Sequence, residues 1–137
     1  MFRILIAALC LSIFAQYLSS QHFIGLDKDE VRQLVARFHE EFIEDESVRN
    51  PVYDLIRYTD LLENQTLLFV FDEDGKCRYF KHICDYSLLD EMIRKLDGKF
   101  EKQDDDGWFY EHQGQTYQIT LKKEEWYFVL DTRKAEE

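Results

Sequence analysis

Two amphipathic segments, each followed by short apolar runs and turn signals, constrain the fold of this 137-residue chain most strongly. The first segment begins at Asp27, and Glu30 stands three residues later, which is the capping-box spacing of a helix N-terminus. Its apolar residues then recur at helical spacing: Val31, Leu34, Val35, Phe38 and Phe42. We expect this helix to end in the acidic stretch 44–46, before Pro51.

The second amphipathic segment repeats the pattern later in the chain. Ser87 with Asp90 is again a capping-box spacing, and Gly98 is a suitable C-terminal stop. One helical face collects the apolar residues Leu89, Met92, Ile93, Leu96 and Phe100. The similarity of the two halves indicates either a duplicated helix-plus-meander unit or simply the residue composition that amphipathic helices share.

Apolar runs rich in β-branched and aromatic residues follow each helix, and Asp-Gly or Gln-Gly turn signals separate several of them. The predicted strands are 52–58, 66–71, 76–84, 108–111, 116–121 and 126–130. The pattern predicts an α+β fold in which two helices pack on one face of an antiparallel sheet of about six or seven strands. Two of the runs, 67–71 and 126–130, are apolar on both sides, so either they are central strands or something covers the second face.

The first twenty residues are typical of a secretory signal peptide. Arg3 precedes an apolar run from Ile4 to Ala15, which is shorter than the roughly 20 residues of a membrane-spanning helix. We therefore expect a signal peptide over 1–20, one α+β domain over 21–132 and a charged tail over 133–137. The expected location is outside the cytoplasm, periplasmic or extracellular.

The charge balance excludes some partners. There are 17 Lys and Arg residues against 28 Asp and Glu, a net charge of −11. Nucleic acids and anionic membrane surfaces are recognised by clustered Lys and Arg, so neither is expected as a partner. An acidic chain favours a protein partner with a basic patch, mainly through the rate of association.

Several residue runs carry a family resemblance: 23–31 after the apolar leader, 71–78 with its acidic turn, 83–86, and 125–128. Together they resemble a group of small exported proteins of Bacteroidetes to which no activity is assigned. The layout is loosely similar to the folds of the β-lactamase-inhibitor protein and of small outer-membrane-assembly lipoproteins. These resemblances imply binding of proteins rather than catalysis. Unlike the lipoproteins, the chain lacks a lipobox, because Leu9 precedes Cys10 inside the apolar run.

The two cysteines after the leader, Cys77 and Cys84, have three possible roles. On one strand they would lie roughly 23 Å apart and on opposite faces, whereas a disulfide needs Cα atoms within about 7 Å. Two buried thiols are therefore favoured, and a bridge would require the strand prediction to fail. A zinc site with His82 lacks the second ligand pair. The acidic turns 72–74 and 104–106 match hairpin turns better than calcium loops, and no cofactor is predicted.

The aromatic residues are the remaining candidates for function. Tyr and Trp dominate the energetics of protein interfaces, although most of those in strands belong to the core. We predict a non-catalytic, exported protein-binding module with an aromatic-rich sheet face, and the candidate binding residues are Tyr79, Trp108, Tyr110 and Tyr127. The alternatives are a homodimer that covers the second sheet face and a small hydrolase that uses His82. A hydrolase predicts a concave pocket that contains His82 and at least one acid.

Overall fold

The computed structural model describes residues 22–47, 50 and 52–135. The predicted signal peptide lies outside the described residues. The first half holds α2 (Lys28–Phe38), β1 (Phe42–Glu44), β2 (Asp54–Asp60), β3 (Gln65–Phe71) and β4 (Cys77–Asp85). The second half holds η1 (Tyr86–Leu88), α3 (Leu89–Lys99), β5 (Glu101–Asp104), β6 (Gly107–His112), β7 (Gln115–Lys123) and β8 (Tyr127–Lys134).

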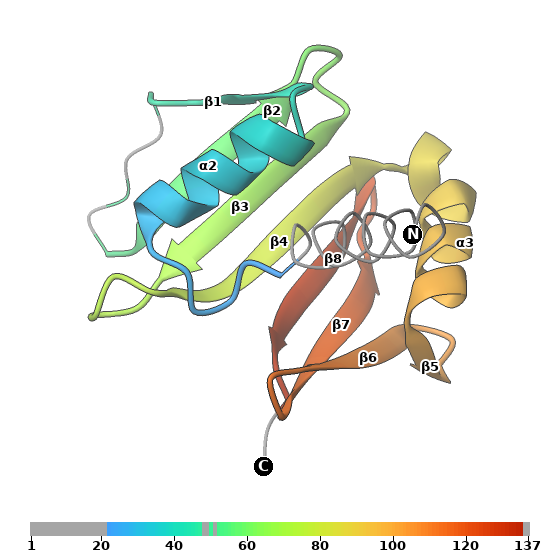
Figure 1. Cartoon of the computed structure of the whole chain (residues 1–137). Helices are drawn as coiled ribbons and strands as arrows, with labels where there is room; N and C mark the ends of the chain where they lie inside the picture. Colours follow the sequence, from blue (N-terminus) through green and yellow to red (C-terminus); the bar gives the residue numbers. More distant parts are fainter. Residues whose placement is uncertain (1–21, 48–49, 51, 136–137) are drawn as a thin grey trace, which may run out of the picture.

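All eight strands belong to one antiparallel sheet in the order β1-β2-β3-β4-β8-β7-β6-β5 (Figure 1). Each half is a helix followed by a four-stranded meander, and the halves join where their last strands, β4 and β8, pair. The predicted α+β class is confirmed. The described residues form eight strands rather than six or seven, because the residues of β1 and β5, the two short strands at the sheet edges, carry no clear strand pattern.

Helix α2 begins as the capping-box spacing predicted. The Asp27 carboxylate accepts a hydrogen bond from the backbone N–H of Glu30 at 2.9 Å, and the Glu30 carboxylate accepts one from the N–H of Asp27 at 3.3 Å. The helix ends at Phe38, however, not in the acidic stretch 44–46. Phe42 therefore enters the core from β1 instead of extending the helical stripe.

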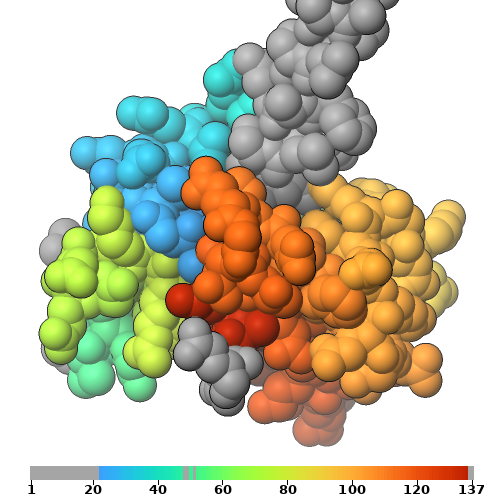
Figure 2. All heavy atoms as spheres, turned by 60° about the horizontal axis from the view of Figure 1, so that its bottom comes forward, coloured from blue at the N-terminus to red at the C-terminus, as the bar shows by residue number. Residues whose placement is uncertain are grey.

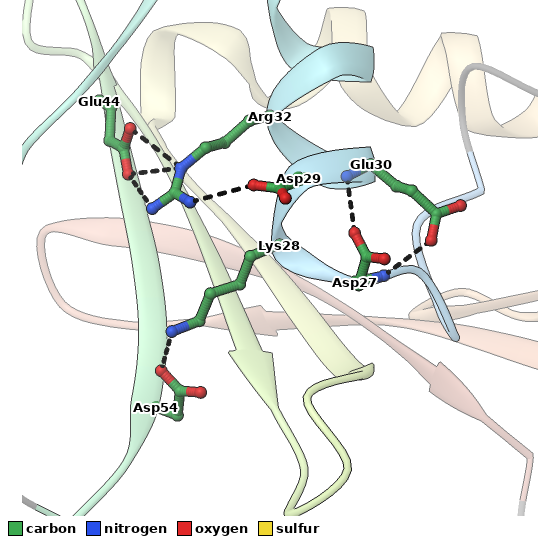
Figure 3. A network of polar contacts seen from close by, with 7 residues as sticks. All are labelled: Asp27, Lys28, Asp29, Glu30, Arg32, Glu44 and Asp54. Atoms are coloured by element: carbon green, nitrogen blue, oxygen red, sulfur yellow. Dashed lines mark hydrogen bonds and ion pairs between the residues drawn. The ribbon is translucent and has the colours of Figure 1, made fainter.

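Ion pairs tie α2 to the neighbouring edge of the sheet (Figure 3). Arg32 reaches from the helix to Glu44 of β1, with Nη2 and Oε1 3.0 Å apart, and Lys28 pairs with Asp54 at the start of β2. Glu44, the first residue of the acidic stretch 44–46, is thus a strand residue that pairs with the helix and is not part of the helix.

Both helices cover the same face of the sheet. A continuous row of paired residues, Leu67, His82, Leu130 and Leu121, runs across β3, β4, β8 and β7 on that face. The first core cluster packs beneath α2 and includes Val31, Val35, Ile56, Tyr58, Phe69 and Phe71. The second packs beneath α3 and includes Trp108, Ile119, Leu121, Phe128, Met92 and Leu96.

A β-bulge in β4 corrects the prediction for the two cysteines. Val70 pairs with Tyr79, but Phe71 pairs with Cys77, so Arg78 is an extra residue on β4. The bulge restores Cys77 to the helix-covered face, where Cys84 also lies. The thiols therefore share a face instead of opposing each other, and both are free and buried.

The ends of α3 and β8 also differ from expectation. The capping box predicted at Ser87 and Asp90 is absent, because α3 begins at Leu89 without a side-chain cap and the N–H of Ser87 binds Asp85. Gly98 lies inside α3, which continues to Lys99, and the N–H of Phe100 closes the last turn on the carbonyl of Leu96. Strand β8 continues through Lys134 because Arg133 pairs with Tyr79 and Lys134 with Tyr117. The paired strand thus extends two residues into the predicted tail 133–137.

Candidate functional site

The sheet face opposite the helices, called the open face below, is covered by no element of the described residues. Its centre is a polar cluster on β4 and β8. The Arg133 guanidinium lies 4.5 Å from the centre of the Tyr79 ring and binds both carboxylate oxygens of Asp131 at 2.7 Å. Lys81 adds a second cation 3.9 Å from Asp131. Tyr79 is therefore a half-buried ring in a charged surrounding, not part of a purely apolar patch.

Apolar side chains surround this polar cluster. Leu68, Val70, Ile83 and Val129 alternate with the core residues of β3, β4 and β8, so they lie on the open face. Tyr127, at the start of β8, is on the same face and is 43% exposed. The runs that are apolar on both sides belong to β3 and β8, which are interior strands, and Val70 and Val129 are buried among their neighbours on the open face.

The other two predicted binding residues lie on the helix-covered face. Trp108 has no exposed surface, and its indole N–H donates a hydrogen bond to Asp97 of α3 at 2.9 Å. Tyr110 is half-buried on the same side, and its hydroxyl lies 3.0 Å from Nδ1 of His22. The predicted group of four residues is therefore split. In β6 the open-face aromatic residue is Phe109, which the sequence prediction missed.

A groove of about 850 Å³ opens on the helix-covered face, between α3 and the segment that links α2 to β1. Its floor is formed by β3, β4, β8, β7 and β6 through Leu67, Phe80, His82, Leu130, Thr132, Ile119 and Tyr110. One wall is α3 and the residue after it, with Met92, Leu96 and Phe100, and the other wall contains Phe23, His39 and Phe42. Its size is within the range of small-molecule pockets.

His82 is the most buried ionisable group on the groove floor. Its Nε2 lies 2.8 Å from Oε1 of Gln65 on the neighbouring strand β3. Burial lowers the pKa of His82 to about 4, and the nearby His39 acts in the same direction. The imidazole is therefore neutral at pH 7. The groove floor presents mainly apolar surface, and the polar pair of His82 and Gln65 within it is satisfied.

His22, the first described residue, packs against aromatic side chains of β6 and β7. The His22 ring stacks on His112 at 4.0 Å between ring centres and meets Tyr117 edge-on at 4.6 Å. In Figure 2, blue atoms of the N-terminal part lie beside the orange atoms of the β6–β7 region. Burial, followed by repulsion from His112, lowers the pKa of His22 to about 4. The N-terminal residues are thus part of the packed structure.

The groove contains the residue types that the hydrolase alternative requires, because Glu41 and Glu91 line it together with His82. Cys84, the thiol closest to His82 in the sequence, does not have the properties of a nucleophile. Burial raises the pKa of the Cys84 thiol to about 12, so it stays protonated, and the Nε2 of His82 is engaged by Gln65. The arrangement is better suited to binding than to activating a nucleophile.

The acidic segments 72–74 and 104–106 form hairpin turns that their own aspartates stabilise. Asp72 accepts hydrogen bonds from the backbone of Asp74 and Lys76, at 2.9 and 3.0 Å, and Gly75 has the positive φ of 74° that a tight turn requires. Asp104 accepts one from the N–H of Asp106. Within the described ranges, no group of three or more His, Cys, Asp or Glu residues is placed to hold a metal ion.

None of the described helices combines the length and the apolar character needed to cross a membrane. Comparisons with protein-family models, curated proteins and solved structures find no match to this chain.

Proposed function

We propose that this protein is a non-catalytic binding module that holds a protein partner on the open face of its sheet. The observation that carries the proposal is the composition of that face. Tyr79 and Tyr127 lie there with Leu68 and Ile83, and the described residues supply no covering layer. Exposed aromatic side chains between apolar and charged neighbours are the usual anchors of protein interfaces.

The charges of the open face suit a specific rather than a purely apolar contact. Lys81 and Arg133 both bind Asp131, so the cations are held in place before a partner arrives. Such an arrangement lowers the ordering cost of binding. The net charge of −11 belongs to the whole chain and favours encounter with a partner that carries a basic patch.

Export and family membership are part of the same proposal. The leader over residues 1–20 would direct the chain to the periplasm or the exterior, where small exported proteins of Bacteroidetes with a similar sequence pattern would be its relatives. The repeated helix-plus-meander topology supports a duplicated unit, as does the pairing of the two halves through β4 and β8. The loosely similar inhibitor and assembly-lipoprotein layouts support binding by analogy of fold alone.

Native mass spectrometry of the protein recovered from its own compartment tests the proposal. We expect a complex with another protein that is lost in a Tyr127→Ala variant and kept in a Trp126→Ala variant. Trp126 is a matched control because it is an adjacent aromatic residue, is 78% exposed, and lies in the turn before β8. Loss of the complex in both variants, or in neither, would contradict binding through the open face.

A homodimer is the second candidate, since Leu68, Ile83 and Tyr127 keep some exposed surface on the open face that a second copy would cover. The same experiment separates the two, because a homodimer doubles the mass instead of adding a foreign one. A hydrolase would instead lose its activity in a His82→Gln variant, whereas a binding module would have no activity to lose.

A further inference from the structure

We propose that the groove between α3 and the α2–β1 segment is a second binding site, independent of the open face, and that its ligand is a single-chain anionic amphiphile such as a long-chain fatty acid. The groove occupies the opposite side of the sheet from the proposed protein-binding surface. It joins an apolar floor to a basic rim, and each of these features limits the ligand.

The volume of the groove favours a narrow ligand over a helix. Its floor reaches from β3 to β6, which is roughly 19 Å at a spacing of about 4.8 Å between neighbouring strands. A helix with its side chains is about 10–12 Å across, so about 850 Å³ would hold at most about two turns of it. An alkyl chain is narrower, so more of its length fits the same volume.

The hydrogen bonding of the floor disfavours an extended peptide. β4 pairs with β3 and β8, and β8 pairs with β4 and β7, so both floor strands already have partners on each side. A peptide strand lying there would bury its own N–H and C=O groups without a backbone partner, which is costly. An alkyl chain has no such groups.

The rim indicates the charge of the ligand. Three bases line the groove, Arg94, Lys95 and Lys99, against the two acids Glu41 and Glu91. In the whole chain the acids outnumber the bases by 28 to 17, so this local excess of bases runs against the overall balance. Lys95 pairs with Glu91 at 3.2 Å, so the excess positive charge of the rim comes from Arg94 and Lys99 against Glu41. A carboxylate head group is the complement of such a rim.

Calorimetric titration with palmitate tests the proposal on the chain in the form that its own host produces. We expect one molecule bound per chain and an affinity that falls from palmitate to laurate, because each buried methylene contributes roughly a fourfold factor. Hexadecyltrimethylammonium, with the same chain length and the opposite charge, should bind at least about tenfold more weakly than palmitate.

Two variants locate the site. An Arg94→Glu/Lys95→Glu variant should weaken palmitate binding about tenfold or more, while Lys122→Glu/Lys123→Glu, an equal charge change at exposed positions of β7, should not. Met92→Trp should weaken binding by filling the groove without a change of charge. Circular dichroism verifies that each variant is folded. Absence of saturable binding, equal binding of the two amphiphiles, or equal loss in the two charge variants would overturn the proposal.

Discussion

The indole N–H of Trp108 donates a hydrogen bond to Oδ1 of Asp97 at 2.9 Å, which joins the largest fully buried side chain of the second half to helix α3. The donor is fully buried and its acceptor stands at the helix surface, where Lys102 also approaches Asp97 at 3.5 Å. One carboxylate therefore fixes both the rotamer of the core tryptophan and the position of the last turn of α3.

Removal of this acceptor should destabilise the fold. We expect Asp97→Ala to lower the free energy of unfolding by about 1–3 kcal/mol, because the buried indole N–H is left without its partner. In a Trp108→Phe background, where no donor remains, the same substitution should cost much less. Urea denaturation of the four proteins in this double-mutant cycle measures the coupling. Equal costs in the two backgrounds would show that the hydrogen bond contributes nothing.

The N-cap residue of α2, Asp27, should contribute more to the stability of the fold than the neighbouring acid, Asp29. Asp27→Ala removes the side-chain acceptor for the N–H of Glu30 and is expected to cost about 1 kcal/mol. Asp29 is an exposed residue of the same turn, 3.9 Å from Arg32, so Asp29→Ala should cost less than about 0.5 kcal/mol. Thermal unfolding followed by circular dichroism compares the two. A larger loss for Asp29→Ala would refute the capping account.

Acid should destabilise the protein through His82. The folded-state pKa is lowered to about 4, chiefly by burial and then by His39, while Asp60 opposes the shift and Lys95 supports it. The unfolded chain takes up its proton near pH 6.5, so stability is fully present above that pH and is lost as the pH falls toward 4. The loss attributable to this group reaches up to about 3 kcal/mol.

A His82→Gln variant provides the control for this pH dependence. Its free energy of unfolding is lower at pH 7, because packing is disturbed, but it should fall less steeply between pH 6.5 and pH 4 than that of the unsubstituted chain. Urea denaturation at a series of pH values gives both curves. Parallel curves would mean that other groups account for the acid sensitivity.

The two thiols should be unreactive in the folded protein. Burial raises the pKa of both Cys77 and Cys84 to about 12, and both are free. Iodoacetamide at pH 8 should leave them unlabelled in the native state, and both should be labelled after unfolding without a reductant. Mass spectrometry of the peptides that contain them shows the result. Labelling that requires a reductant would reveal a disulfide instead.

Local signals in the sequence predicted much of the fold. The capping box of Asp27 and Glu30 and the Asp-Gly turn at Gly75 depend only on residues close together in the chain, and both are confirmed. The edge strands were missed because they are short and carry little pattern: all four residues of β5 are exposed, and β1 has three residues. The spacing of Phe42 fits the apolar stripe of the helix as well as it fits a strand, so the pattern alone predicts the wrong element for it.

The candidate sites were harder to predict because they depend on pairing between distant segments. The faces of Trp108 and Phe109 follow from the register of β6 with β7, and a run with aromatic residues on both sides does not reveal that register. The bulge at Arg78 reverses the expected side of Cys77. The groove joins residues from Phe23 to Thr132, and no local spacing connects them.

The pairing of β4 with β8 has a consequence for how such a chain could arise and how it must fold. Each half ends in a strand whose outer edge finds its only partner in the other half, so a half produced alone would expose a nine-residue or an eight-residue edge strand. Because the pairing is antiparallel, two copies of one half could meet through that edge about a two-fold axis. In the intact chain β4 and β8 belong to one polypeptide, so the pairing between them does not depend on protein concentration.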